Sequence, residues 1–225
     1  FTEAMSTARQ AGAKLQISHI QPKFGAPGHA MEHTLEMIDI ARTHDGDIAF
    51  DVIPHDWNHT LMAAILPKWA QAGSIDDVLK RLANPEMREQ IKANPKPMWL
   101  IVKARQWKDI ILLNATENKD LVGANFEEIG RMRSVDPYDA VLDILLEEGD
   151  NMMAAMWSSK SFLNSDIDLC LEQAECAVIS DTVAIANDGI LSDHIGSLSG
   201  YGWAARFLQH YVRDRGVLSL SQALA

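Results

Sequence analysis

The first fifty residues alternate between helical and strand-like patterns, and this alternation restricts the fold more than any other feature of the sequence. Residues 2–11 form a helical pattern, and residues 14–19 form a short apolar strand. After a loop rich in Gly and Pro, residues 33–42 are helical, and residues 47–52 form a second strand that ends before Pro54. Strands that alternate with helices usually pair in parallel, so the pattern predicts an α/β fold built from β/α units.

The middle of the chain departs from this pattern. Residues 66–94 resemble a series of short helices separated by Pro and Gly. Two strand-like runs follow at residues 99–102 and 110–113. Asp136-Pro137 then begins a helix that runs to Gly149, since Asp is a good N-cap and Pro suits the first helical position. We interpret residues 66–158 as an insertion between two β/α units.

The β/α pattern returns near the end of the chain. Residues 159–174 are predicted to form a helix, and residues 176–181 a third strand that ends in an acidic residue. Residues 201–215 form a further helical pattern, and residues 219–225 begin another. We therefore expect three strands of one parallel sheet.

Composition excludes several classes of partner. The 225-residue chain carries a formal net charge of −11, which disfavours binding to a nucleic-acid backbone. The sequence contains no apolar stretch of the roughly 18 residues needed to span a bilayer, so we expect no membrane partner. Two Cys residues cannot form a disulfide framework, and they suit a reducing compartment. These features predict a cytoplasmic protein that binds neither nucleic acid nor membranes.

Both ends of the sequence suggest a longer protein. The chain does not begin with Met, and it ends inside a helical pattern that has no stop signal. Its start also has neither the basic nor the apolar region of a signal peptide. We therefore expect the chain to be part of a larger protein.

Each of the three predicted strands ends in residues that are able to do chemistry. The first ends in Ser18-His19, the second in residues 51–55, and the third in Ser180-Asp181. In a β/α barrel the active site lies at the C-terminal ends of the strands. A His and an Asp at neighbouring strand ends are suited to binding a metal ion and to moving a proton.

Spacing alone does not decide these roles. A lone His after a strand is more often a structural hydrogen-bonded residue than a metal ligand. Asp181 on its own is better explained as a residue that caps or braces its loop. Asp51 is compatible with an ordinary loop acid.

Several segments, taken in order, resemble the D-aminoacylases, the N-acyl-D-amino-acid deacylases of the amidohydrolase superfamily. Residues 15–19, Leu-Gln-Ile-Ser-His, are similar to the family's sixth barrel strand, which ends in Ser-His. Residues 50–55 resemble the next strand, Asp-x-Tyr-Pro-Tyr, and residues 179–181 resemble the last strand with its catalytic Asp. Residues 201–214 match the family's closing pattern of Tyr-Gly and Leu-x-x-Tyr-Val-Arg-Glu. The resemblance runs from about residue 4 to the end.

The resemblance implies a fold and a reaction. The fold would be the C-terminal part of a metal-dependent (β/α)8 barrel, with a mixed α/β insertion at 66–158 between the last two barrel strands. The N-terminal half of the barrel and the flanking β domain would lie outside residues 1–225. The reaction would be hydrolysis of the C–N amide bond of an N-acyl-D-amino acid by a water that a divalent metal, zinc, activates.

The resemblance also assigns residues to roles in this reaction. It makes His19 a metal ligand and Asp181 the catalytic acid and base. His55, His59 and His194 follow the second and third strands, and we regard them as candidate substrate-binding residues. The remaining His residues lie on or beside predicted helices, and we interpret them as solvated or packing residues: His29, His33, His44 and His210.

Four positions depart from the family pattern. Gln21 stands where the family often has Lys, Ile53 and His55 replace the two Tyr residues, and Thr182 replaces a Gly. These positions line the substrate pocket in the family, so two alternatives stay open. One is a related amidohydrolase that acts on another C–N bond, such as a cyclic amide. The other is a non-catalytic barrel relative that acts as a binding module. An intact His-x-His motif on the first barrel strand would favour an enzyme.

Overall fold

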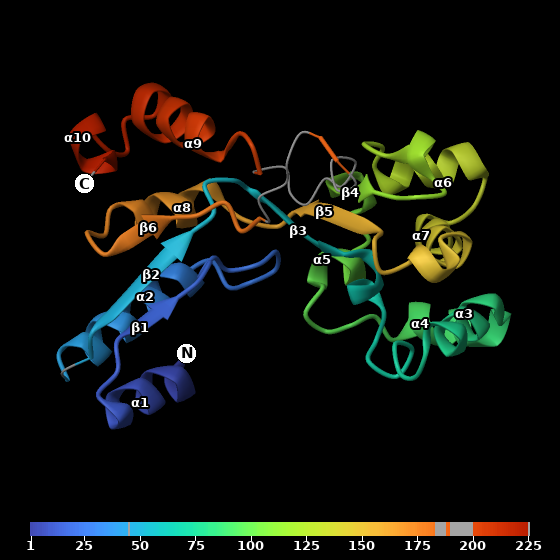
Figure 1. Cartoon of the computed structure of the whole chain (residues 1–225), viewed down its shortest axis with the longest axis horizontal. Helices are drawn as coiled ribbons and strands as arrows, with labels where there is room; N and C mark the ends of the chain where they lie inside the picture. The colour runs from blue at the N-terminus through green and yellow to red at the C-terminus, as the bar shows by residue number, and fades with distance from the viewer. Residues whose placement is uncertain (45, 183–187, 190–199, 225) are drawn as a thin grey trace. The chain divides into compact units, whose positions relative to one another are not determined.

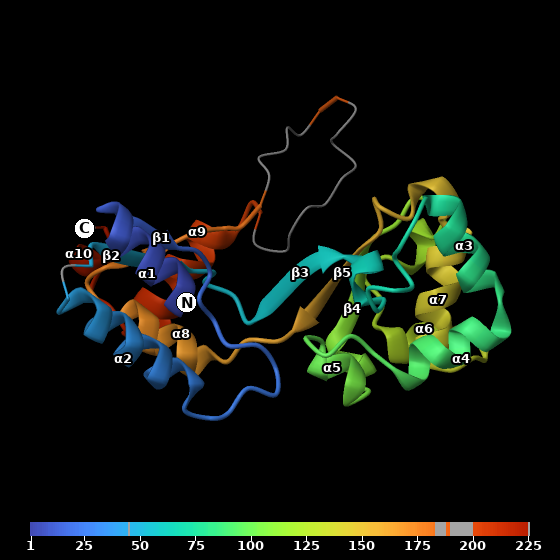
Figure 2. The same ribbon diagram turned by 90° about the horizontal axis from the view of Figure 1, so that it is seen from below.

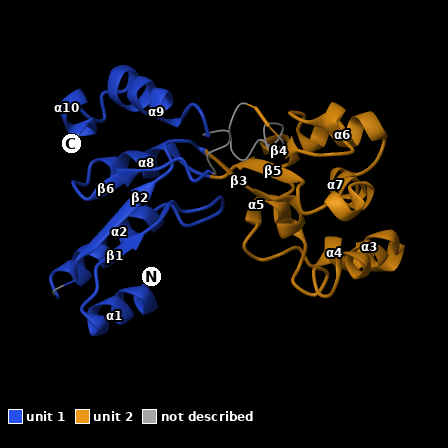
Figure 3. Cartoon of the chain, in the orientation of Figure 1, with its two compact units in different colours: residues 1–56, 162–182, 199–225 blue, residues 57–161, 183–198 orange. Residues whose placement is uncertain are grey.

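In the computed structural model the chain forms two compact units (Figure 3). The structure describes residues 1–44, 46–182, 188–189 and 200–224. Unit 1 comprises Phe1–Asp56, Phe162–Thr182 and Ser199–Ala225, and unit 2 comprises Trp57–Ser161 and Val183–Leu198. The predicted excursion at 66–158 therefore falls within Trp57–Ser161, which lies between two parts of unit 1 in the sequence.

Unit 1 is built on a parallel sheet of three strands, as the β/α pattern predicted (Figure 1). The strands are β1 (Leu15–Ile17), β2 (Ile48–Val52) and β6 (Cys176–Val178). Their order is β1-β2-β6, so the strand in the middle of the sheet is β2. In the described part of the chain β1 and β6 each pair only with β2, which leaves both outer edges of the sheet without a strand partner.

Helices cover one face of this sheet. Alternate residues of β2 (Ile48, Phe50 and Val52) are buried in a core with the apolar faces of α2 and α8. The side chains between them on β2, Ala49 and Asp51, belong to the opposite face. The helices of unit 1 are α1 (Thr2–Ala11), α2 (Ala30–Arg42), α8 (Asn164–Leu171), α9 (Trp203–Arg206), the π-helix η5 (Phe207–Asp214) and α10 (Leu220–Ala223).

Unit 2 has a different architecture, because its three strands are antiparallel (Figure 2). The strand order is β3 (Trp57–Leu61), β5 (Met156–Lys160), β4 (Ile110–Asn114). The helices are α3 (Ile75–Ala83), α4 (Pro85–Ala93), α5 (Leu100–Lys103), α6 (Phe126–Arg133) and α7 (Pro137–Glu147). Short 3₁₀ turns lie at Met62–Ile65, Trp107–Asp109, Lys119–Leu121 and Gly149–Asn151.

Two predicted elements were wrong. Residues 99–102 were predicted as a strand, but α5 forms from Leu100 onward; an apolar run this short suits a buried helical turn as well as a strand. Residues 159–174 were predicted as one helix, but Ser159 belongs to β5, and α8 begins only at Asn164. β5 forms because it pairs with β3 about a hundred residues away, and the hydroxyl of Ser158 donates to the carbonyl of Asn58 at 2.6 Å. Local patterns do not record such a contact.

No helix within the described ranges is both long and apolar enough to cross a membrane.

Candidate functional site

His19 lies just beyond the C-terminal end of β1. The strand ends at Ile17, and the side chain of His19 is exposed. Its φ angle is 38°, in the left-handed region that residues other than Gly rarely adopt. The sequence prediction that a His follows the first strand is therefore confirmed in position, while its role as a metal ligand stays a prediction.

Asp181 occupies an equivalent place after β6. The pairing with β2 continues past the formal strand end, because the amide of Ile179 donates to the carbonyl of Val52 at 3.0 Å. Asp181 follows two residues later, exposed, with a φ angle of 47°. His19 and Asp181 are two of four non-glycine residues with positive φ in the described ranges. Such strained backbone is concentrated at functional sites, which makes these two positions candidates for one.

The topology places His19 and Asp181 on either side of one strand. β1 and β6 both flank β2 and run in the same direction. Their C-terminal ends therefore lie at the same end of the sheet. Two inter-strand spacings, about 10 Å, separate their backbones.

Asp51, near the C-terminal end of β2, lies at the same end of the sheet. Its side chain is only 5% exposed, so the prediction of an ordinary loop acid was wrong. The carboxylate accepts hydrogen bonds from the Gln16 amide at 2.9 Å, the Ser18 hydroxyl at 3.0 Å and the His19 backbone N–H at 2.6 Å. Sequence analysis gave Asp51 no role, although one signal was available. Asp51 falls on the opposite side of β2 from its apolar residues, where alternation places a side chain on the second face of the sheet.

Gln21 has a structural role at the same end of the sheet. It is 6% exposed, and its side-chain amide donates to the carbonyl of Ile53 at 2.6 Å and accepts from the amide of Ile53 at 3.1 Å. The side chain thus pairs with the backbone in the way that a neighbouring strand would. This pairing gives Gln21 a structural role at a position where the D-aminoacylases often have Lys.

The other His candidates are dispersed. His55 lies in unit 1 with its ring half-buried and its Nδ1 3.4 Å from the carboxylate of Asp56. Arg206 holds the same turn, since its guanidinium donates to the carbonyl of Pro54 and contacts Asp56. His59 lies in unit 2 on β3, opposite Ser158 of β5. His194 lies outside the described residues.

The described residues do not form a complete metal site. Within them no three His, Cys, Asp or Glu side chains gather closely enough to hold an ion. His19 and Asp181 provide an imidazole nitrogen and a carboxylate oxygen, which are donor types that zinc accepts. The donor chemistry therefore fits part of a zinc site, and further ligands would have to come from elsewhere in the protein.

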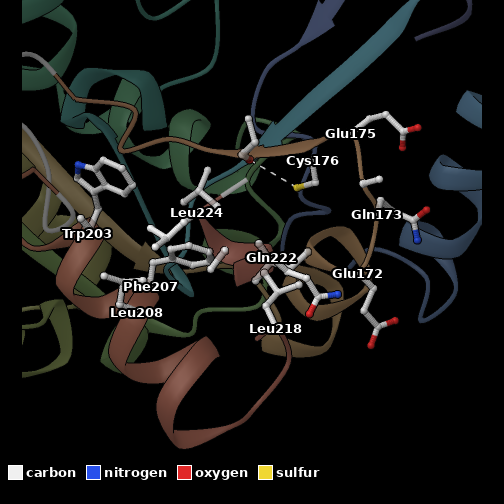
Figure 4. A pocket seen from close by; sticks show the side chains of 16 residues that line it. Glu172, Gln173, Glu175, Cys176, Trp203, Phe207, Leu208, Leu218, Gln222 and Leu224 are labelled. Atoms are coloured by element: carbon white, nitrogen blue, oxygen red, sulfur yellow. Dashed lines mark hydrogen bonds between the residues drawn. The ribbon is translucent and has the colours of Figure 1, made fainter. Parts of the chain in front are cut away.

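A cavity in unit 1 lies beside β6 and is lined by none of these residues (Figure 4). It has a volume of about 720 Å³ and is lined mainly by apolar side chains of η5, α10 and the neighbourhood of β6, including Phe207, Leu218 and Leu224. Its thiol, Cys176, is unsuited to nucleophilic chemistry, because burial raises its pKa to about 12. None of His19, Asp51 and Asp181 lines this cavity, so we do not assign the chemistry to it.

The sequence has no match among known family models or curated proteins. The fold does have matches among solved structures. The N-acyl-D-glutamate deacylase of Bordetella bronchiseptica, solved with zinc and a phosphonate that mimics the tetrahedral intermediate, matches 99% of this chain with a TM-score of 0.66 and 19% identity. A D-aminoacylase with a binuclear metal centre matches 99% of the chain with a TM-score of 0.62 and 20% identity.

These neighbours agree with the resemblance found in the sequence. They are D-aminoacylases, and a structure of the group is described as defining a novel subset of amidohydrolases. Another was solved with copper chloride. The chain spans 36% of the length of each of these neighbours. At this level of identity the likeness establishes a shared fold.

Proposed function

We propose that the chain is the C-terminal part of a metal-dependent (β/α)8 barrel that hydrolyses the amide bond of a small N-acylated substrate, an N-acyl-D-amino acid. One observation carries the proposal. His19 and Asp181 follow parallel strands that flank the same central strand, and both adopt left-handed backbone conformations. The shared fold with D-aminoacylases supports this assignment.

The roles follow from the donor chemistry of the two side chains. His19 provides an imidazole nitrogen to a divalent metal, zinc, whose other ligands lie outside this chain. When bound, zinc polarises the substrate carbonyl and lowers the pKa of a coordinated water toward about 7. Asp181 accepts the proton that the attacking water releases and then delivers it to the leaving amine.

Unit 2 fits the role of an insertion between the last two barrel strands. Trp57–Ser161 leaves the sheet after β2, and the chain returns through α8 to β6. Among the described residues the barrel strands would then be β1, β2 and β6. The rest of the barrel wall would pair with the open edges of β1 and β6, since a barrel has no unpaired edge.

Substrate specificity is expected to differ from that of enzymes with the Tyr-Pro-Tyr pattern. Ile53 is 2% exposed and offers no hydroxyl, while His55 presents a half-buried imidazole beside Asp56. We assign His55 to substrate binding, and we retain His59 and His194 as weaker candidates. A cyclic amide is the alternative substrate, because these differences alter the pocket without removing His19 or Asp181.

The metal assignment is tested with His19→Ala in the full-length protein. The variant should lose bound zinc in elemental analysis and lose turnover of N-acyl-D-amino acids. The control is His44→Ala, since His44 is exposed just past α2 and its ring makes only local contacts, with the carbonyl of Ile40 at 2.8 Å and the hydroxyl of Thr43 at 3.1 Å. Equal zinc content in wild type and His19→Ala would contradict the assignment.

The proton-transfer role is tested with Asp181→Asn. Loss of a general base should lower kcat by about 10²–10⁴-fold and change KM much less. A residue that only braces its loop would instead lower the melting temperature and leave kcat within a few-fold of wild type. Steady-state kinetics and a thermal melt on both proteins separate the two roles. Full-length protein that binds zinc but turns over only cyclic amides would favour the alternative substrate.

A further inference from the structure

The four residues that follow β1 are each tied to β2 or to Ile53, the residue that follows it. The hydroxyl of Ser18 and the backbone N–H of His19 donate to the carboxylate of Asp51. The amide of Ile20 donates to the backbone carbonyl of Asp51 at 3.2 Å, and the side chain of Gln21 pairs with the backbone of Ile53. The chain around His19 is thus held along β2 although regular strand pairing has ended.

Asp51 accepts a hydrogen bond from the backbone of His19 itself. One carboxylate oxygen, Oδ1, accepts from both Ser18 and His19, and the other, Oδ2, accepts from Gln16. All three donors are neutral groups of the β1 segment, so the carboxylate binds that segment without a cation among them. Because Asp51 is 5% exposed, its position is fixed by the sheet.

The contact with the His19 N–H coincides with an unfavourable backbone conformation. A left-handed conformation is unfavourable at a residue with a Cβ, so it persists only where other contacts determine it. The 2.6 Å hydrogen bond from the His19 N–H to Asp51 fixes the orientation of the peptide group that precedes the turn. The direction in which the imidazole leaves the backbone depends on that turn.

We propose that Asp51 is a positioning residue, whose carboxylate sets the backbone conformation that directs the His19 imidazole toward a bound divalent metal. This inference rests on the proposed function, in which His19 is a metal ligand. Asp51 acts through the backbone of His19, and it touches neither metal nor substrate. Groups behind a metal ligand commonly change affinity by about 10–100-fold when removed.

The test compares zinc affinity and melting temperature in the full-length protein. Asp51→Ala should weaken zinc binding at least tenfold, measured by competition with a chromophoric chelator. Asp51→Asn should rescue it to within about threefold, since Oδ1 is kept and Gln16 can turn its amide to face the new NH₂ group. If Asp51→Ala fails to fold, Asp51→Glu replaces it, because the longer side chain keeps the charge but displaces the carboxylate, and it should also weaken zinc binding.

The matched control is Gln21→Ala, which removes the neighbouring tie to Ile53 and leaves the His19 N–H bond intact. It should lower the melting temperature but leave zinc affinity within about threefold of wild type. If Gln21→Ala weakens zinc binding as much as Asp51→Ala, or if Asp51→Ala binds zinc like wild type, the positioning role is overturned. His19→Ala belongs to the same titration. If it keeps zinc, the ligand assignment and this proposal both fail; if it loses zinc while Asp51→Ala does not, only this proposal fails.

Discussion

Each unit of the chain contains a buried carboxylate that holds a loop after a strand, and the two loops differ in what they carry. In unit 1, Asp51 binds the segment after β1 through two side chains and one backbone N–H. In unit 2, Glu148 is 2% exposed and binds the turn after β4. It accepts from the backbone amides of Thr116, Glu117 and Asn118 and from the side chain of Asn118.

The comparison shows that burial and hydrogen bonding alone do not identify a functional carboxylate. Glu148 has more donors than Asp51 and is more deeply buried, yet the turn that it holds carries no imidazole. Asp51 holds a turn in which an exposed His adopts a strained conformation. The two carboxylates differ in the residues that they hold. Asp51 is assigned a functional role because it holds His19, and Glu148 is assigned a structural role because its turn contains no His.

The two units also differ in how their helices are encoded. In unit 2, side chains cap the N-termini of α3, α4, α6 and α7. In unit 1, the short helix α10 has a capping box at Ser219, but α1, α2 and α8 have no side-chain cap; in unit 2 the short helix α5 has none. Among α-helices of eight or more residues, local sequence therefore specifies those of unit 2 more strongly, and those of unit 1 depend more on packing against the parallel sheet.

The largest effect is expected when residues 1–225 are produced alone. The chain should have no amidase activity, and unit 1 should unfold at a lower urea concentration than unit 2, because its sheet is parallel and, under the proposed function, β1 and β6 would pair with further barrel strands, whereas the sheet of unit 2 is antiparallel. Tryptophan fluorescence follows unit 2 selectively, since five of the six Trp residues lie there, and hydrogen exchange at β2 follows unit 1. The five are Trp57, Trp69, Trp99, Trp107 and Trp157.

A single cooperative transition seen by both methods, together with amidase activity, would contradict this expectation. It would mean that the open edges of β1 and β6 do not need the rest of a barrel.

Much of the difference between the two units could be predicted from the sequence. The helix–strand alternation predicted β1, β2 and β6, and Asp136-Pro137 predicted the start of α7. These elements are determined by local periodicity and by caps. β3 and β5 were not predicted, because their strand state depends on pairing between residues about a hundred positions apart, as between Asn58 and Ser159.

The residues of the candidate site could be predicted from the sequence only in part, for a related reason. His19 and Asp181 stand directly after apolar runs, so their place at strand ends is visible in the sequence. The role of Asp51 is different, since it depends on the register that sets β2 beside the residues following β1. The pairing function of Gln21 likewise depends on which residue of β2 lies opposite. Register across a sheet is a tertiary property, and sequence spacing does not contain it.

The second largest effect is expected for Glu148→Ala. It leaves the amides of the turn at Thr116 and Asn118 without their acceptor and should lower the free energy of unfolding of unit 2 by about 2–4 kcal/mol. Zinc affinity of the full-length protein should not change, in contrast to Asp51→Ala. Urea titration followed by tryptophan fluorescence measures the first quantity and chelator competition the second.

The matched control for Glu148→Ala is its neighbour. Glu147 forms an exposed ion pair with Arg133 at 2.9 Å, so Glu147→Ala should cost less than about 1 kcal/mol. Equal losses in the two variants would show that the buried turn contributes no more than a surface pair. A loss of zinc in Glu148→Ala would remove the functional distinction between the two carboxylates.

A smaller effect is expected at a helix cap. Ser74 caps α3 and forms a capping box with Asp77, so Ser74→Ala should destabilise unit 2 by about 1 kcal/mol in urea titration. Ser165→Ala, in the first turn of the uncapped helix α8 of unit 1, should change stability by less than about 0.5 kcal/mol. If both substitutions cost the same, caps do not explain why the helices of the two units differ.

The smallest effect is a pH dependence of opposite sign in the two units. In unit 1, burial of Asp166, reinforced by nearby Glu32, raises its pKa above the usual 3.8, so folding favours the protonated acid. The resulting stability is present below pH 3.8 and is lost as the pH rises through the raised pKa. In unit 2, hydrogen bonds from the backbone and hydroxyl of Ser74 lower the pKa of Asp77 below 3.8. The stabilisation by Asp77 is present above that value and is lost as the pH falls through the lowered pKa.

Acidification from neutral pH should therefore add to the stability of unit 1 through Asp166 and remove stability from unit 2 through Asp77. Asp166→Asn should abolish the first trend and Asp77→Asn the second, when melting is followed by hydrogen exchange for unit 1 and by tryptophan fluorescence for unit 2. If Asp166→Asn leaves the pH profile of unit 1 unchanged, or shifts that of unit 2, the buried acid does not titrate with the fold of unit 1, and the two units do not differ in this respect.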